Sequence, residues 1–287
     1  MNILILGSTG MIGHKLYEVL SRNSNFRLFN ISKSKLNDDT KIVDLRYMNQ
    51  IEEILDYVRP DVVVNVAGLL IEDSQSKPLD AVLINTVLPL SLNLLSKKIR
   101  FKLIQISTDC VFSGDTGPYQ VDDSTDAKNI YGKTKALGEI SDQINLTIRT
   151  SVIGPDLKKD GKELLNWFVQ QSGSIKGFTK SIWSGVTTLE LAKCIEHCIV
   201  NNIGGIHHLS SGTQISKYDL LSLLNNYLTN KIDIKKTDGP VTNKVLLNKN
   251  NCIYGINKTY KLIIKEMVND IIESKNYPHY KLFKNSH

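Results

Sequence analysis

Tyr131 and Lys135, in the segment NIYGKTKALGE, are the residues whose types and spacing most clearly permit chemistry. Two residues four apart lie on the same side of a helix, about one turn from each other. A phenol has a reference pKa of about 10, and a nearby ammonium lowers it toward the range where protons exchange efficiently. The spacing therefore predicts a tuned acid, although a solvated pair on a helix surface would show the same pattern.

A glycine-rich turn near the N-terminus predicts a binding site for a dinucleotide. The run MNILILG predicts a short buried strand, and a helix is expected over about 11–22. The glycines between them let backbone approach a pyrophosphate at the helix N-terminus. The candidate cofactor-binding residues of this turn are Gly7, Thr9, Gly10, Met11, Ile12 and Gly13.

The residues that end the second predicted strand favour NADPH over NADH. NAD-specific folds of this type place an acidic residue there, which binds the ribose 2′-OH. This chain has Ser32, Lys33 and Ser34 instead, and hydroxyl and ammonium groups suit a 2′-phosphate. A solvent-exposed loop that tolerates either cofactor would fit the same residues, so NADH stays open.

Two further strand ends add candidate cofactor contacts. Asp44 and Leu45 follow a third predicted strand, where the carboxylate could accept a hydrogen bond from an adenine amine or cap the next helix. Val66, Ala67 and Gly68 follow the fourth strand, at the edge where open α/β sheets bind ligands. Their small side chains would let backbone lie close to a cofactor.

A polar segment after the fifth predicted strand could contact a substrate. It contains Ser107, Thr108, Asp109 and Cys110. A hydroxyl here, together with the Tyr131 phenol, could bind a substrate carbonyl oxygen. A hydroxyl, a phenol and a lysine beside a nicotinamide would form a hydride-transfer site.

The order of the predicted elements indicates how these segments could meet. Strands alternate with helices over the first 155 residues, which predicts an α/β fold with a doubly wound parallel sheet of the Rossmann type. The predicted strands are 1–7, 26–32, 41–45, 61–68, 101–107 and 144–151, and the predicted helices are 11–22, 47–58, 78–98 and one that opens at the Tyr131 segment.

The alternation weakens after residue 155. Helices are expected over 161–171, 188–200 and 221–228, a loop over 230–251, and an extended tail from about residue 277. We therefore expect a dinucleotide-binding domain over 1–155 and a smaller substrate-binding region over 156–287. Segments around 180–210 are expected to return to the Rossmann core.

Bulk composition indicates an ordinary globular enzyme. Of 287 residues, 41% are hydrophobic and 22% charged, and the net charge is +6. The lysines are scattered, so no nucleic-acid partner is expected. The four cysteines form no disulfide framework, which fits the cytoplasm. The N-terminal apolar run is too short for a signal peptide or a membrane span, so no membrane partner is expected.

Six segments resemble the extended short-chain dehydrogenase/reductases, and more closely the dTDP-4-dehydrorhamnose reductase branch. They are GSTGMIGH at 7–14, NVAG at 65–68, INTVLP at 84–89, STDCVFSG at 107–114, YGKTKALGE at 131–139 and IRTSVIGP at 148–155. VTTLELA at 186–192 matches more faintly. The resemblance implies an NADPH-dependent reduction of a nucleotide-linked 4-keto-6-deoxyhexose, in the synthesis of surface polysaccharide sugars.

The resemblance also implies roles for individual residues. Thr108 aligns with the catalytic hydroxyl of the family, with Ser107 as the second candidate. Tyr131 would donate a proton to the keto oxygen. Lys135 would hydrogen-bond the nicotinamide ribose and lower the Tyr131 pKa. The candidate substrate contacts are Ser107, Asp109, Cys110 and Trp183, and no metal is expected.

Cys110 departs from the family pattern, which has a Tyr at this position. GDP-fucose synthase, a relative, uses a Cys here together with a His for epimerisation before reduction. No His occurs between His14 and His197 in this chain, so plain reduction is favoured over an epimerase-reductase. A non-catalytic binding subunit is a further alternative, because the beta subunit of methionine adenosyltransferase resembles this branch. A homodimer also stays open.

Two other features are expected to be structural. Cys194, His197 and Cys198 have metal-ligand side chains, but their position on an amphipathic helix favours packing in the core. Asn85, in the helix that would flank the site, is expected to bond backbone groups.

Overall fold

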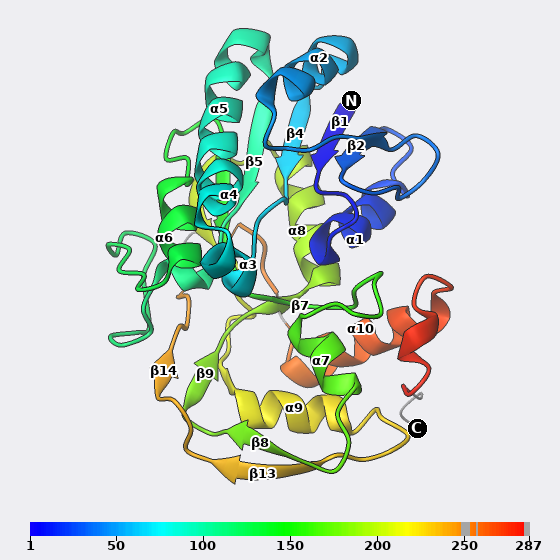
Figure 1. Cartoon of the computed structure of the whole chain (residues 1–287), viewed down its shortest axis with the longest axis vertical. Coiled ribbons are helices and arrows are strands. Elements are labelled where there is room, and N and C mark those ends of the chain that lie inside the picture. Colours follow the sequence, from blue (N-terminus) through cyan, green and yellow to red (C-terminus); the bar gives the residue numbers. More distant parts are fainter. Residues whose placement is uncertain (248–252, 257, 284–287) are drawn as a thin grey trace.

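The computed structural model, which describes residues 1–247, 253–256 and 258–283, contains a parallel sheet of seven strands (Figure 1). The strand order is β11-β6-β5-β4-β1-β2-β3. The chain moves outward from β1 in both directions, so the sheet is doubly wound, as the sequence predicts. The strands are β1 (Asn2–Leu6), β2 (Arg27–Ser32), β3 (Lys41–Ile42), β4 (Val62–Asn65), β5 (Lys102–Ile106), β6 (Leu146–Arg149) and β11 (Gly205–His208).

Helices cover both faces of the sheet, which explains why β1 is apolar from Ile3 to Leu6. Ile3 and Ile5 belong to one buried cluster, and Leu4 and Leu6 belong to the cluster on the opposite face. A strand that is covered on both faces has no polar side. The covering helices are α1 (Met11–Leu20) and α8 (Thr188–Val200) on one face, and α2 (Met48–Val58), α4 (Pro78–Val82) and α5 (Leu88–Leu95) on the other, with α3 (Ile71–Ser76) and α6 (Ile130–Leu137) near its lower end.

The predicted helix over 78–98 is one continuous helix, Pro78–Arg100, that includes two π-helical turns at Leu83–Val87 and Ser96–Arg100. Its length and mean hydropathy of 1.5 would be enough to cross a membrane. It is instead a core helix here, because Leu88 and Leu92 pack against the sheet and are almost completely buried.

A second hydrophobic core lies below the carboxyl edge of the sheet (Figure 1). Phe168, Leu224 and Met267 belong to it and come from three different helices. Between its segments the chain returns to the sheet, because β11 pairs with β6. The elements here are β7 (Val152–Ile153), α7 (Leu164–Val169), β8 (Ser174–Phe178), β9 (Ser181–Trp183), β10 (Val186–Thr187), β12 (Ile215–Ser216), α9 (Lys217–Asn225), β13 (Asp233–Thr237), β14 (Thr242–Asn243) and α10 (Tyr260–Glu273).

The predicted loop over 230–251 is wrong in part, because it contains β13 and β14; residues 248–251 lie outside the described residues. β13 pairs with β8 in a two-stranded sheet. Lys235 and Lys236 are exposed and Ile234 is only half-buried, so the strand has little apolar pattern by which to recognise it.

The predicted extended tail from residue 277 is also wrong over 277–283; residues 284–287 lie outside the described residues. Pro278–Tyr280 forms a 3₁₀ turn, and Tyr277, Tyr280 and Phe283 are buried in the second core. Three aromatic side chains supply enough contact area to hold this segment in place. Their partners are distant in sequence, so no local pattern reveals the contact.

Candidate active site

A cavity of about 480 Å³ lies where the segments that follow β5 and β6 face the second core. This is the edge at which open α/β sheets bind ligands. The predicted site residues that line it are Met11, Ile12, Ser107, Thr108, Asp109, Cys110, Tyr131 and Trp183. The structure therefore brings together segments from both ends of the predicted domain and one from beyond it.

The glycine turn has the geometry that a dinucleotide diphosphate needs. Gly7 has a φ of +87°, which favours glycine, and a Cβ there would lie 3.0 Å from the Ala67 nitrogen. A Cβ on Gly13 would lie 2.2 Å from the Gly7 carbonyl oxygen, so only glycine lets α1 pack this close to the turn. No side chain caps α1 at Gly10, which leaves its first N–H groups for a ligand.

Hydroxyl groups gather at the end of β2, as the sequence predicts for a 2′-phosphate site. Thr9 Oγ1 lies 2.5 Å from Ser32 Oγ, and Ser34 Oγ donates to Thr9 Oγ1 at 3.2 Å. Lys33, between the two serines, is exposed. None of residues 32–34 is a carboxylate that could accept from a ribose hydroxyl. The hydroxyl and ammonium donors there fit a phosphate better.

Asp44 has a protein partner that the sequence did not reveal. Arg46 binds its carboxylate with two nitrogens, Nε at 3.0 Å and Nη2 at 2.5 Å, and this interaction lowers the Asp44 pKa. Leu45 beside it is buried. Arg46 also binds Asp80 at 3.1 Å, so the predicted adenine contact would share its carboxylate with an arginine.

The segment after β4 connects the glycine turn with Lys135. Val66 donates its backbone N–H to the Leu6 carbonyl, and Ala67 donates to Asn65 Oδ1 at 3.2 Å. A Cβ on Gly68 would lie 3.9 Å from Lys135 Nζ. Asn85 Oδ1 would lie 3.3 Å from the same Cβ, so glycine lets the backbone lie close to both side chains.

Helix α6 brings Tyr131 to the cavity wall and Lys135 to the end of β5. Asn129 caps the helix by accepting from the Gly132 N–H at 2.8 Å. A Cβ on Gly132 would lie 2.0 Å from the Cys110 carbonyl oxygen, so glycine permits this approach. Lys135 is buried and donates to the Ile106 carbonyl at 2.6 Å, and burial lowers its pKa to about 8.

The Tyr131 pKa is raised, whereas the sequence predicted that Lys135 would lower it. Burial is the largest cause, and the nearby Cys110 and Asp109 add to it, while interaction with the Thr108 hydroxyl acts in the opposite direction. The Lys135 ammonium is itself desolvated and bonded to backbone. The phenol therefore keeps its proton at neutral pH.

The Thr108 hydroxyl faces Tyr131, whereas the Ser107 hydroxyl bonds Glu139. Thr108 Oγ1 accepts from the Cys110 N–H at 3.1 Å and donates to Asp109 Oδ1 at 3.2 Å. Ser107 Oγ donates to Glu139 at 2.6 Å, a residue whose carboxylate forms a buried ion pair with Arg149. The geometry thus agrees with Thr108 as the first candidate.

Cys110 is held as a thiol. Burial raises its pKa to about 12, and the neighbouring Asp109 adds to the shift, with Lys244 opposing it. A thiol with this pKa is a poor base at neutral pH. Cys110 therefore shapes the wall of the cavity without supplying a thiolate.

Lys217 and Glu163 are wall residues that sequence reasoning missed. The Lys217 ammonium lies 5.1 Å from the centroid of the Trp183 ring, and no ion pair with it occurs in the part of the chain that the structure describes. Burial raises the pKa of the Glu163 carboxyl, with Asp156 adding to the shift. Neither residue stands in a motif, so the sequence carried no signal for them.

The structural interpretations of Asn85 and the two cysteines are confirmed. Asn85 accepts from the Leu69 N–H at 2.9 Å and donates to the Leu69 carbonyl at 3.1 Å. Cys194 and Cys198 lie in the core beneath β1, with their sulfurs 3.9 Å apart.

Several proteins are similar to this chain in sequence. A spore coat polysaccharide biosynthesis protein of Bacillus subtilis, SpsK, is 29% identical over 228 residues, which are 77% of each chain. The dTDP-4-dehydrorhamnose reductase of Salmonella typhimurium is 27% identical over 236 residues, 78% of this chain and 77% of the relative. The methionine adenosyltransferase 2 subunit beta of Xenopus tropicalis is 25% identical over 231 residues, 76% and 69% of the two chains.

A solved structure has the same fold over nearly the whole chain. The dTDP-4-dehydrorhamnose reductase of Bacillus anthracis, crystallised with NADP, superposes with a TM-score of 0.80 over 94% of this chain and 99% of that chain, at 20% identity. The family model of the RmlD substrate binding domain matches residues 1–240. Together with the site geometry, this match places the chain in the RmlD substrate binding domain family, an extended short-chain dehydrogenase/reductase of the dTDP-4-dehydrorhamnose reductase branch.

Proposed function

We propose that this protein uses NADPH to reduce the 4-keto group of a nucleotide-linked 4-keto-6-deoxyhexose. The observation that carries the proposal is the shared cavity wall, where Thr108 and a protonated Tyr131 lie beside the N-terminus of α1. The reductase names among its relatives support the reaction class.

Tyr131 is the proton donor of the proposed reaction. Its half-buried phenol keeps its proton and lines the cavity, so it can donate to an oxygen that gains negative charge as the carbonyl is reduced. The Thr108 hydroxyl would hold the same oxygen. The bound nicotinamide would supply the hydride to the keto carbon.

The glycine turn, the hydroxyl group cluster and Lys135 would hold the cofactor. The free N–H groups at the start of α1 suit its diphosphate. Thr9, Ser32 and Ser34 suit a 2′-phosphate, which favours NADPH over NADH. The Lys135 ammonium, near Gly68, would bind the nicotinamide ribose.

The other wall of the cavity would bind the sugar nucleotide. Lys217 is a cation without an ion-pair partner among the described residues, and Trp183 presents its ring beside it. A diphosphate is the anionic group that this substrate class would offer to Lys217. Glu163, a carboxyl on the same wall, would accept a hydrogen bond from a sugar hydroxyl.

Epimerisation before reduction is less well supported. It requires a base near the sugar. Burial raises the pKa of the Cys110 thiol to about 12, so this thiol keeps its proton at neutral pH. No histidine lines the described part of the cavity.

A binding subunit on this fold is the second candidate, favoured by the similarity to a methionine adenosyltransferase subunit. Such a subunit does not need a positioned phenol, hydroxyl and ammonium. Turnover of a 4-keto sugar would exclude it, whereas stoichiometric capture of a partner enzyme without turnover would support it.

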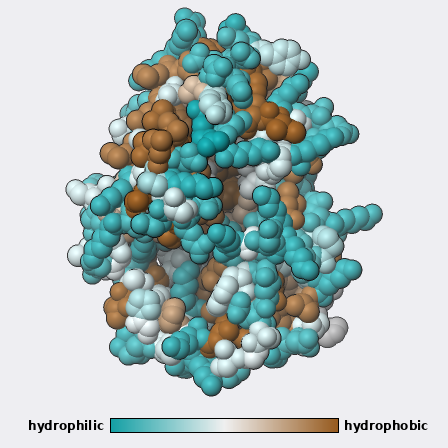
Figure 2. Space-filling view, viewed as in Figure 1, coloured by the Kyte–Doolittle hydropathy of each residue, from teal (hydrophilic) through white to brown (hydrophobic). Residues whose placement is uncertain are grey.

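We also propose a homodimer in the cytoplasm. Leu79, Val82, Leu90 and Leu94 expose apolar side chains along the outer side of the long helix, and Leu137 of α6 is 68% exposed beside it. Figure 2 shows apolar surface in this part of the molecule. A contiguous exposed apolar surface indicates an interface, and light scattering after gel filtration would reveal the doubled mass.

The proposed reaction is tested by mixing the protein with NADPH and a nucleotide-linked 4-keto-6-deoxyhexose while following the absorbance of the reduced cofactor. We expect oxidation of NADPH that depends on both protein and sugar. A panel of such sugars that gives no oxidation, although NADPH binds, would exclude the proposal.

A further inference from the structure

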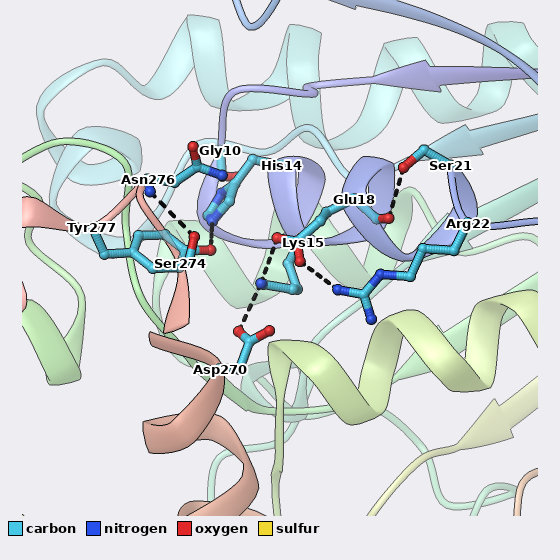
Figure 3. A network of polar contacts seen from close by, with 10 residues as sticks. All are labelled: Gly10, His14, Lys15, Glu18, Ser21, Arg22, Asp270, Ser274, Asn276 and Tyr277. Carbon is cyan, nitrogen blue, oxygen red and sulfur yellow. Dashed lines mark hydrogen bonds and ion pairs between the residues drawn. The ribbon is translucent and has the colours of Figure 1, made fainter. Parts of the chain in front are cut away.

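The C-terminal segment reaches back to the glycine turn through α1. His14, in the first turns of α1, lies between the Gly10 carbonyl and the Tyr277 hydroxyl (Figure 3). Its Nδ1 is 2.8 Å from the Gly10 oxygen, and its Nε2 is 2.8 Å from the Tyr277 oxygen. The family match ends at residue 240, so Tyr277 lies in a part of the chain that the match does not include.

The donor and the acceptor of each hydrogen bond between Gly10, His14 and Tyr277 follow from the chemistry of these groups and from their burial. A carbonyl oxygen only accepts, so His14 Nδ1 carries the proton that goes to Gly10. Burial lowers the His14 pKa, so the ring is neutral and Nε2 is an acceptor. The Tyr277 O–H must then donate to Nε2, and burial raises the Tyr277 pKa, which keeps that proton in place.

Fixing the Gly10 carbonyl also fixes the direction of the next N–H. Gly10 accepts from both the His14 side chain and the His14 N–H, at 2.8 and 3.2 Å. The peptide unit is planar and trans, so its C=O and the following N–H point in opposite directions. The Met11 N–H is therefore directed out of the N-terminus of α1, toward the side on which Met11 lines the cavity.

Buried contacts hold Tyr277 itself in place. Lys15 is fully buried and pairs with Asp270 of α10 at 2.7 Å and with Glu18 at 2.6 Å (Figure 3). Its ammonium lies 5.3 Å from the centroid of the Tyr277 ring. A fully buried ammonium requires a charged partner, so the Lys15–Asp270 pair fixes α10 against α1.

The same segment also holds the loop that leads to the substrate wall. Tyr280 Oη accepts from the Asp156 N–H at 3.1 Å, and His279 Nε2 lies 3.0 Å from the Asp156 carbonyl. This loop continues to Lys162 and Glu163, which line the cavity. Tyr277 and Tyr280 thus contact residues of the two segments, α1 and the loop from Asp156, that continue into the cavity lining at Met11 and at Glu163.

We propose that Asp270–Tyr280 is a positioning segment, in which Tyr277 sets the dinucleotide turn through His14 and Tyr280 sets the substrate loop through Asp156. The inference rests on the proposed function, because it takes the glycine turn as the cofactor site. His14, Tyr277 and Tyr280 are positioning residues, since each acts through another residue.

Tyr277→Phe and Tyr280→Phe form a matched pair that tests the assignment. Each removes one hydroxyl from the same segment and keeps the ring. One hydrogen bond contributes about 0.5–1.5 kcal/mol, so an effect of about twofold to tenfold is expected. Tyr277→Phe should raise the Kd for NADPH by that factor and leave the KM for the sugar nucleotide unchanged. Tyr280→Phe should do the reverse.

His14→Asn sharpens the test, because its amide can still donate to Gly10 while its link to Tyr277 is lost. We expect the NADPH Kd of His14→Asn, Tyr277→Phe and the double variant to rise by the same factor, since both changes break one contact. The proposal would be overturned if the NADPH Kd and the KM for the sugar nucleotide changed by the same factor in every variant, in parallel with the loss of Tm. The segment would then stabilise the fold as a whole without positioning either site.

Amide hydrogen exchange of the ligand-free protein separates this inference from the proposed function. Tyr277→Phe should speed exchange over residues 10–14 and leave residues 156–163 as in the wild type, with the converse for Tyr280→Phe. A wild type that binds no NADPH would exclude the proposed function and leave this readout intact. Unchanged exchange in both segments would overturn the positioning role.

Discussion

The two walls of the cleft differ in what carries their function. On the side formed by residues 1–155, the glycine turn depends on backbone geometry, with Gly7 at a φ of +87° and Gly13 directly against the turn. The opposite wall depends on side chains from separate segments, such as Trp183, Lys217 and Glu163. Backbone geometry needs glycine at fixed spacing and leaves a motif, whereas side chains that meet only in space leave none.

Tyr131→Phe should have the largest effect on activity. It tests whether the proton donor lies on the wall formed by residues 1–155. The variant loses the proton donor, so kcat should fall by roughly 10²–10⁴-fold while the Kd for NADPH changes little. Steady-state kinetics and a fluorescence titration measure the two quantities. Tyr57→Phe, at a residue 78% exposed, is the matched control. Full activity in Tyr131→Phe would mean that another group donates the proton.

Gly13→Ala tests whether the same wall depends on backbone approach. The added Cβ would lie 2.2 Å from the Gly7 oxygen, so the turn must shift. Overpacking of this kind costs about 1–3 kcal/mol, and we expect NADPH affinity to fall by about tenfold or more. Gly255→Ala is the control, because nothing lies within 4 Å of its Cβ position. A normal NADPH titration of Gly13→Ala would contradict the close approach.

Lys217→Met tests the wall that no motif predicted. A hydrogen bond to a charged group contributes about 1.5–3 kcal/mol. Loss of the Lys217 ammonium should therefore raise the KM for the sugar nucleotide about tenfold or more. The Kd for NADPH should stay constant. Lys176→Met, at an exposed residue of β8, controls for the change in net charge. An unchanged KM would remove Lys217 from the substrate site.

The sequence predicted the sheet and the N-terminal wall, and it did not predict how the second core closes over them. The apolar run at 2–6 and the glycines of the turn have local signals, because each serves its immediate neighbours. β13 lies at an edge with exposed lysines, and Tyr277 is held by partners more than 250 residues away. Such contacts depend on the tertiary fold, so no window of sequence contains them.

The raised pKa of Tyr131 is a second difference of this kind. The spacing of Tyr131 and Lys135 placed both on one helix, as predicted. Burial, which the spacing could not indicate, then dominated both groups and directed the Lys135 ammonium to the Ile106 carbonyl. Local geometry was predictable, and the local dielectric was not.

The smallest expected effect is a pH dependence that belongs to Lys135. Its pKa is lowered to about 8, so the ammonium loses its proton as the pH rises through that value. NADPH affinity should therefore be constant below about pH 7 and fall severalfold between pH 8 and 9.5. The Lys135→Met variant should bind more weakly and show no such decline. If the NADPH affinity of the wild type stayed constant up to pH 9.5, the Lys135 ammonium would have no role in cofactor binding.

The most direct test of the central claim follows the transferred hydrogen. The protein is incubated with a nucleotide-linked 4-keto-6-deoxyhexose and NADPH that carries deuterium at the nicotinamide C4 position. The account predicts a sugar product whose mass is one unit higher than that made with ordinary NADPH, with the deuterium on the former keto carbon. A product without deuterium from either C4 epimer of the cofactor would contradict the account, as would an unreduced sugar in the presence of bound cofactor.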